Sequence, residues 1–227
     1  MSQLALPLRL ADHAVFASFL DAGNEALVAT LQSLAEGEPG PGCWLWGARA
    51  TGKTHLLQAA CAQAGDRSVY VPLRDLAVAG PQSVDGLASR DLVCIDDIDT
   101  VAGNAAWETA LFVMYNQIAE AEGRLVVAAA TAPRATRIVL PDLESRLSRL
   151  PIFQLQALDE GQRAAALQLR ARHRGLSLPD DTARYLLSRS RRDMASLYGW
   201  LDRLDAEALR AQRRLTIPFV REVMQQH

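Results

Sequence analysis

A single lysine, Lys53, restricts what this chain can fold into more than any other residue. It lies in the segment Gly47-Ala48-Arg49-Ala50-Thr51-Gly52-Lys53-Thr54, and every other one of the 24 lysine and arginine side chains is an arginine. The compact ammonium of lysine and the planar guanidinium of arginine bind phosphate with different geometry, so one does not substitute for the other. The spacing is the Walker A pattern G-x-x-x-x-G-K-[ST], in which backbone N–H groups and the lysine hold phosphates. We therefore predict that residues 47–54 bind the phosphates of ATP or ADP, with the Thr54 hydroxyl as a ligand of Mg²⁺.

Apolar runs of strand length alternate with helical patterns over the first two thirds of the chain. The expected strands are Trp44–Trp46, Ser68–Val71, Leu92–Ile95, Leu125–Ala130 and Ile152–Leu155. This alternation predicts an α/β fold, a five-stranded parallel sheet flanked by helices, with loop 47–54 between the first strand and a helix over 55–63. Apolar residues at helical spacing between the third and fourth strands predict a core-facing helix: Trp107, Leu111, Met114 and Ile118.

The strand signal ends after residue 158, and only helical patterns follow. The expected helices cover 159–173, 181–189, 193–212 and 218–226, the last with Thr216 as its cap and Pro218 in its first turn. We therefore expect an extended N-terminal segment (1–12), an α/β nucleotide-binding body (13–157) and a small, all-helical C-terminal lid (158–227).

Two carboxylates follow the third expected strand, in Leu92-Val93-Cys94-Ile95-Asp96-Asp97. Four apolar residues ending in an acidic side chain form a Walker B pattern. We expect Asp96 to hold Mg²⁺, directly or through water, and Asp97 to polarise the attacking water. An Asp-Asp turn after a buried strand would look the same in isolation, but the Walker A segment upstream favours the nucleotide site.

The bulk composition excludes several classes of protein. Apolar residues make up 49 % of the chain and charged residues 22 %, as in an ordinary globular protein. The longest uncharged apolar run, 125–132, is too short to cross a bilayer, and the N-terminus has no signal-peptide pattern. Cys43, Cys61 and Cys94 are widely spaced and odd in number, which is typical of reduced thiols in a cytoplasmic protein. We expect no membrane partner.

Arginine is concentrated in the second half of the chain. Residues 1–133 carry 7 basic and 15 acidic side chains, whereas residues 134–214 carry 16 arginines and 10 acidic side chains. Because these arginines alternate with acids and no aromatic platform accompanies them, direct nucleic-acid binding is disfavoured. Arg146, before the last expected strand, is placed to reach the γ-phosphate on another subunit, and Arg192, entering a lid helix, to sense the bound nucleotide.

In these features the sequence resembles AAA+ proteins of the DnaA branch, and within that branch it resembles the Hda-like regulators. The resemblance runs almost end to end, through the Walker segments and 15–19, 140–147, 167–172 and 212–220. It implies a negative regulator of replication initiation that is bound to ADP or ATP with Mg²⁺. Such a regulator binds the DNA polymerase sliding clamp, and DNA only through the clamp, and it stimulates hydrolysis of ATP bound to the initiator DnaA. It would be cytoplasmic and associated with the nucleoid through the clamp.

The resemblance also implies roles for individual residues. Arg146 would be the arginine finger, acting in trans, and Arg192 would close the lid on the nucleotide. Val15 and Phe16, with Phe19, would cover the adenine as the corresponding segment does in related proteins, although core residues at the edge of the body would look the same.

The N-terminal segment Gln3-Leu4-Ala5-Leu6-Pro7-Leu8 resembles the short clamp-binding peptide of bacterial replication proteins. Gln3 would supply hydrogen bonds, Leu4, Leu6 and Leu8 would be apolar anchors, and Pro7 would keep Leu6 extended. A first strand or a packed tail would have the same pattern.

The chain departs from the DnaA branch at the end of the fourth strand. That branch carries an acidic or amide residue there, and the corresponding residue here is Ala130, which has no polar side chain. We therefore expect tight nucleotide binding with slow intrinsic hydrolysis. The alternatives are a self-assembling AAA+ ATPase of the helicase-loader type, which would act as a homo-oligomer, and a binding module whose nucleotide is only structural.

Overall fold

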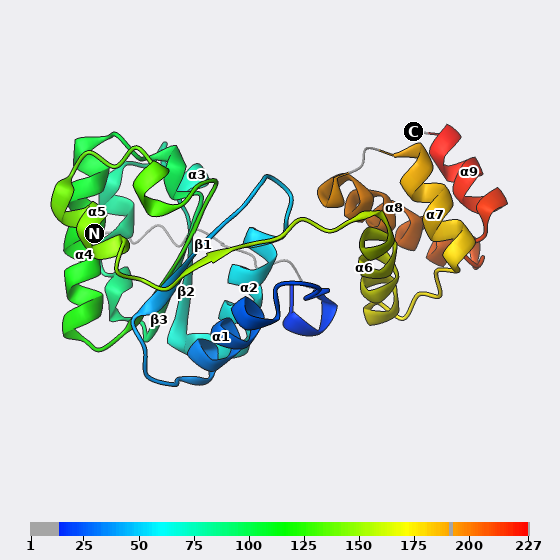
Figure 1. Ribbon diagram of the computed structural model, residues 1–227. Coiled ribbons are helices and arrows are strands. Elements are labelled where there is room, and N and C mark those ends of the chain that lie inside the picture. The colour runs from blue at the N-terminus through cyan, green and yellow to red at the C-terminus, as the bar shows by residue number, and fades with distance from the viewer. Residues whose placement is uncertain (1–13, 191–192, 227) are drawn as a thin grey trace.

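The computed structural model describes residues 14–190 and 193–226 and has an α/β body joined to a helical lid (Figure 1). The centre of the body is a five-stranded sheet with the strand order β2-β3-β4-β1-β5, in which every pairing is parallel. Its strands are β1 (Gly42–Trp46), β2 (Ser68–Pro72), β3 (Leu92–Asp96), β4 (Arg124–Ala129) and β5 (Ile152–Gln154). The predicted α/β class and parallel sheet are confirmed.

The strand register brings the predicted nucleotide segments to one edge of the sheet. Trp46 at the end of β1 pairs with Ala129 at the end of β4, and Ile95 near the end of β3 pairs with Val127. Because the strands are parallel, the segments that follow β1, β3 and β4 leave the sheet at the same edge. In open α/β sheets this carboxyl edge is where ligands bind.

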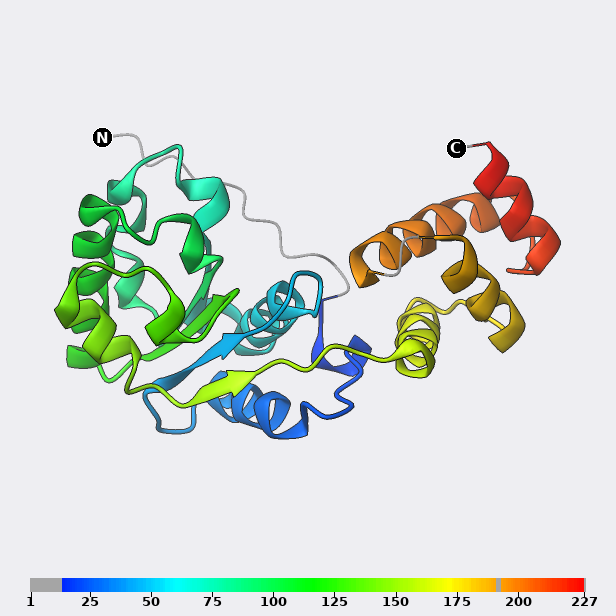
Figure 2. The same cartoon turned by 45° about the horizontal axis from the view of Figure 1, so that its top comes forward.

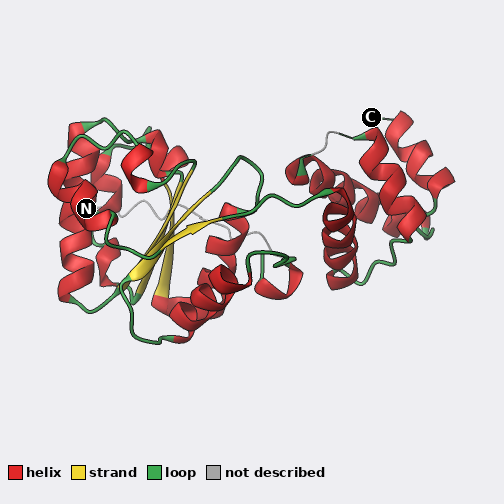
Figure 3. Cartoon of the chain, in the orientation of Figure 1, coloured by secondary structure: helices red, strands yellow, loops and turns green. Residues whose placement is uncertain are grey.

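Helices cover both faces of the sheet (Figure 3). The helices α1 (Glu25–Glu36) and α2 (Lys53–Ala64) pack on one face, and α3 (Leu73–Leu76), α4 (Ala105–Glu120) and α5 (Pro141–Leu147) on the other. The four apolar residues predicted to face the core from the helix between β3 and β4 are all buried in α4. Helix α1 was not anticipated from the sequence, and its apolar stripe contributes to the core over α2.

The lid is a helical unit with an apolar core of its own. It consists of α6 (Glu160–His173), α7 (Asp180–Arg189), α8 (Met194–Ala211) and α9 (Ile217–Gln225), each within one residue of its predicted bounds. Asp159 begins α6 with a capping box to Gln162, and Asp193 accepts a hydrogen bond from the Ser196 N–H at the start of α8. In the segments 14–190 and 193–226, no helix is long and apolar enough to cross a membrane.

A buried carboxylate, Glu108 of α4, holds the chain that leads into α5. Its side chain is 1 % exposed and accepts hydrogen bonds from the backbone N–H groups of Gly103, Val139 and Leu140, the closest at 2.7 Å. Leu140 is the N-cap residue of α5, directly before Pro141. A buried carboxylate must be hydrogen-bonded, so Glu108 fixes the backbone that leads into α5.

We predict that Glu108→Ala lowers the free energy of unfolding by about 2 kcal/mol or more, because it removes the hydrogen bonds that three backbone N–H groups make to a buried carboxylate. Urea denaturation measures the change. Glu120→Ala, at an exposed position of the same helix, is the control and should change stability by less than about 0.5 kcal/mol. Equal stability of the two variants would contradict this role for Glu108.

Candidate functional site

The glycine-rich loop, residues 47–54, leaves β1 and turns sharply into α2. Ala50 and Gly52 have left-handed backbone angles, with φ of 62° and 107°. A Cβ atom on Gly47 would lie 2.8 Å from the Leu155 carbonyl oxygen, and one on Gly52 would lie 2.7 Å from the Phe19 ring. The close neighbours therefore leave no room for a side chain at Gly47 or Gly52, and the left-handed backbone angle of Gly52 also favours glycine.

The Lys53 ammonium lies over the loop that precedes it. Its Nζ donates hydrogen bonds to the carbonyl oxygens of Gly47, at 2.7 Å, and Ala48, at 2.9 Å. Burial lowers the pKa of Lys53, while the nearby carboxylates of Asp96, Asp97 and Asp99 act in the opposite direction. The single lysine of the chain is thus a positive charge at the carboxyl edge of the sheet.

Asp96 links the loop to the third strand. It is 3 % exposed, and its Oδ2 accepts hydrogen bonds from Thr54 Oγ1, at 2.7 Å, and from the Tyr70 hydroxyl, at 2.8 Å. Burial raises the pKa of Asp96, and these two hydrogen bonds partly offset that effect. Tyr70 was not identified from the sequence, because it lies on β2, outside every motif.

The carboxylates after Asp96 fix neighbouring segments at the same edge. Asp97 has a left-handed backbone angle, with φ of 56°, and its Oδ2 accepts a hydrogen bond from Arg74 Nε at 2.7 Å. Asp99 Oδ2 accepts a hydrogen bond from the Ala130 N–H at 2.7 Å, just beyond β4. The sequence analysis did not identify Arg74 or Asp99. The ion pair of Arg74 could not be read from spacing, because α3 and β3 are brought together only by folding.

The Thr54–Asp96 pair has the chemistry of a small Mg²⁺ site. Mg²⁺ prefers hard oxygen ligands and is commonly held by one or two protein groups together with water and phosphate oxygens. The hydroxyl and carboxylate oxygens supply such a pair at 2.7 Å. The described residues contain no cluster of three or more histidine, cysteine or acidic side chains that could hold a metal by themselves. The donor set therefore fits a magnesium ion that arrives with a phosphate ligand.

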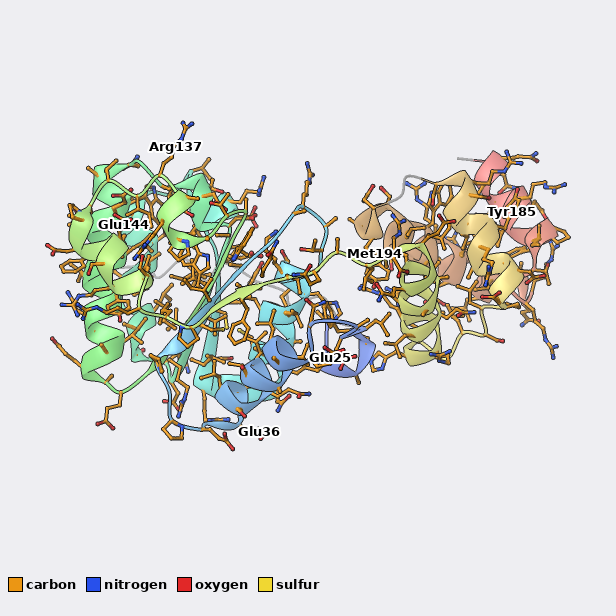
Figure 4. The ribbon with its side chains drawn as sticks, viewed as in Figure 1. Glu25, Glu36, Arg137, Glu144, Tyr185 and Met194 are labelled. Carbon is orange, nitrogen blue, oxygen red and sulfur yellow. The ribbon has the colours of Figure 1, made fainter. Side chains whose placement is uncertain are left out.

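A cavity of about 430 Å³ lies over this edge, between the body and the lid. One wall is formed by residues 49–55 of the glycine-rich loop and the start of α2, with Arg74 and Asp97 beside them. The other wall comes from α6 and α8 of the lid, through Ala166, Arg170, Met194, Ala195 and Tyr198. Figure 4 shows Met194 at the side of the lid that faces the body. The cavity can accept a ligand that contacts both units.

The segment before α1 closes the apolar end of this cavity. Phe19 and Leu20 line it, together with Leu158 after β5, whereas Val15 and Phe16 are not among its lining residues. Val15 instead accepts a hydrogen bond from His55 Nε2 at 3.0 Å. A carbonyl only accepts, so Nε2 carries the proton. His55 thereby ties this segment to α2, one residue after Thr54.

Arg146 lies on α5, away from the cavity. Its guanidinium carbon is 5.5 Å from the Phe112 ring centroid and 5.6 Å from that of Tyr115, both on α4. The helices α4 and α5 lie at one end of the body and the lid at the other (Figures 1 and 2), and Figure 4 marks this end with Glu144, also on α5. Arg192 and the segment Gln3–Leu8 lie outside the described residues.

Comparison with known proteins identifies the lid. Residues 159–224 match the family described as Hda, lid domain, which covers α6 to α8 and most of α9. The C-terminal lid of this chain is thus similar to the lid of the Hda family.

Solved structures of other proteins share the fold of this chain. Domain III of the Thermotoga maritima replication initiation protein DnaA matches with a TM-score of 0.79 at 18 % identity, over 96 % of this chain and 98 % of that one. The replication initiator DnaA bound to AMPPCP and single-stranded DNA matches with a TM-score of 0.71 at 22 % identity, over 90 % and 69 %. The Thermotoga maritima RuvB Holliday junction branch migration motor matches with a TM-score of 0.61 at 18 % identity, over 91 % and 69 %.

We predict that His55 makes the stability of this chain depend on pH. Burial lowers the pKa of folded His55 to about 4, from an ordinary value of 6.5. Between these values only the unfolded chain binds the proton, so the stability is fully present above pH 6.5 and is lost as the pH falls towards 4. Between about pH 7.5 and pH 5 the wild type should lose about 2 kcal/mol more than His55→Gln.

Urea denaturation of both proteins at the two pH values measures this difference. Because every other titrating group is shared, the comparison isolates His55. The same pH dependence in both proteins would show that His55 titrates normally in the folded state.

Proposed function

We propose that this chain binds ADP or ATP, with Mg²⁺, in the cavity between body and lid. The phosphates would lie on the glycine-rich loop, where successive backbone N–H groups, the start of α2 and Lys53 favour negative charge. Thr54 and Asp96 would hold Mg²⁺, and Asp97 would face the attacking water. Phe19, Leu20 and Leu158 offer an apolar surface for the base, and Val15 and Phe16 of the same segment would add to it. Arg192 would close the lid over the nucleotide.

Ala130 supports slow intrinsic hydrolysis. Its backbone N–H is engaged by Asp99, and its methyl side chain cannot hydrogen-bond to a γ-phosphate or to water. In this proposal the nucleotide holds the body (13–157) and the lid (158–227) in one arrangement and is turned over slowly.

We further propose that the chain is a negative regulator of replication initiation, which stimulates hydrolysis of ATP bound to DnaA. The observation that carries this proposal is the position of Arg146, on an Hda-like protein, at the end of the body opposite its own nucleotide cavity. Its guanidinium is held over two aromatic rings of α4, and it is only partly buried. From there it can reach a nucleotide only on a neighbouring molecule, which is how an arginine finger acts in trans.

We propose that residues 3–8 attach the regulator to the sliding clamp. An extended peptide with Gln3 and three alternating leucines can lie in an apolar groove, with its backbone pre-set by Pro7. DNA would then be reached through the clamp, which would concentrate the regulator where initiation has already taken place.

Arg146→Ala should abolish stimulation of DnaA, with a loss of about 10³-fold or more in the stimulated rate, because an arginine finger stabilises transition-state charge. The assay follows hydrolysis of ATP bound to DnaA in the presence of DNA-loaded clamp. Arg149→Ala, at an exposed position one turn further along the chain, is the matched control and should retain stimulation. Undiminished stimulation by Arg146→Ala would refute the assignment of Arg146 as the finger. A second measurement is the steady-state ATP hydrolysis of this chain alone. A cooperative rise of that rate with protein concentration would favour a self-assembling ATPase.

Replacement of Gln3 and Leu4 together by alanine should remove binding to the clamp and, with it, clamp-dependent stimulation of DnaA. The melting temperature should stay within a few degrees of the wild type, since a surface peptide that serves a partner adds little to the fold. Binding to immobilised clamp and thermal unfolding give the two readouts. Loss of fold stability with clamp binding intact would instead identify the segment as part of the body.

A further inference from the structure

The lid side of the cavity carries a cation to which the sequence analysis gives no role, Arg170 of α6. It lines the cavity together with Tyr198 of α8, and its guanidinium carbon lies 4.1 Å from the Tyr198 ring centroid. Among the described residues this is the shortest guanidinium–ring distance, and the guanidinium lies over the aromatic face of Tyr198. Arg170 also makes a side-chain hydrogen bond to Tyr198. A guanidinium has five N–H donors, so others remain for a ligand.

Arg170 lacks the acidic partner that its neighbour has. Its Nε is buried and has no hydrogen-bond partner, and it forms no ion pair with an acidic side chain in the described part of the chain. One turn along the same helix, Arg174 is paired with Asp202. Burial lowers the pKa of Arg170 because its charge is partly removed from water. Such a charge is stabilised when an anion enters beside it.

The charges of the side chains that line the cavity indicate which class of ligand can bind beside Arg170. The described lining carries four cationic side chains, Arg49, Lys53, Arg74 and Arg170, and one carboxylate, Asp97, which already accepts a hydrogen bond from Arg74. Apolar side chains lie at the same cavity, from Phe19 and Leu20 on the body to Met194 on the lid. A ligand with a polyanionic part and an apolar planar part fits this lining, and a nucleoside diphosphate has both.

We infer that Arg170, held in place by Tyr198, is a nucleotide-binding residue of the lid that donates to the phosphate groups of a nucleoside diphosphate in the cavity. The inference rests on the proposed nucleotide binding and adds a residue to it. The contact would join α6 and α8 of the lid to the ligand that the glycine-rich loop holds on the body. Lid position would therefore depend on nucleotide through Arg170 as well as through Arg192.

ADP binding with Mg²⁺, measured by calorimetry on the full chain, tests this contact. Arg170→Gln removes the charge and should weaken ADP binding roughly 10- to 100-fold, the loss of one or two charge-assisted hydrogen bonds. Arg170→Lys keeps the charge without the planar stack, so its affinity should lie between those of Arg170→Gln and the wild type. Arg172→Gln, exposed on the same helix and outside the cavity lining, should bind ADP within about twofold of the wild type.

Thermal unfolding separates a contact with the ligand from a purely structural role. A ligand that binds only the folded chain raises the melting temperature according to its affinity. The rise caused by ADP should shrink in Arg170→Gln, measured against that variant's own melting temperature without ADP. An Arg170→Gln variant with wild-type ADP affinity overturns the inference, as does an Arg170→Lys variant that binds no better than Arg170→Gln. A wild-type chain that binds no ADP contradicts the proposed nucleotide binding itself.

Discussion

The hydrogen bond from Thr54 to Asp96 is the contact on which the site depends. It joins the helix that follows β1 to the end of β3, although β4 lies between these two strands in the sheet. Tyr70 reaches the same carboxylate from β2, so three strands position one buried oxygen atom. A carboxylate that is nearly inaccessible to water must be hydrogen-bonded or paired with a cation. This requirement holds the glycine-rich loop and the Walker B strand at a fixed separation.

The two proposed sites lie at opposite ends of the body, the nucleotide cavity at one end and Arg146 at the other, and α4 packs on the core. At the cavity end, Lys53 and Asp97 line the cavity, and Asp96 is buried and bonded to Thr54. At the other end, α4 makes two kinds of contact with α5. Glu108 accepts hydrogen bonds from the backbone before α5, and the Phe112 and Tyr115 rings lie against Arg146 of α5. The proposed finger is therefore part of a rigid helix pair, and a guanidinium held in this way loses little freedom when it meets a partner's nucleotide.

Much of the fold could be predicted because the local patterns are strong. Buried parallel strands appear as continuous apolar runs, and lid helices begin at acidic caps, so β3 and α6 were located almost to the residue. Helix α1 was missed, although Leu27, Leu31 and Leu34 follow helical spacing, because no motif drew attention to it. The role expected of Val15 and Phe16 at the base remains a prediction, and Phe19 and Leu20 are the residues of that segment that line the cavity.

The sequence by itself determined the class of the fold, the loop at residues 47–54 and the acidic pair after β3, because each is encoded by residues that are close along the chain. Only the tertiary structure decided which side chains surround those elements. Tyr70, Arg74 and Asp99 lie outside the motifs, and the sequence gives Arg170 no role. These residues reach the cavity or its carboxylates through strand order and through packing of the lid on the body. Distance along the chain carries no information about such contacts. Burial supplies the physical reason for them, since a charge or carboxylate removed from water needs a partner from whichever segment the fold brings beside it.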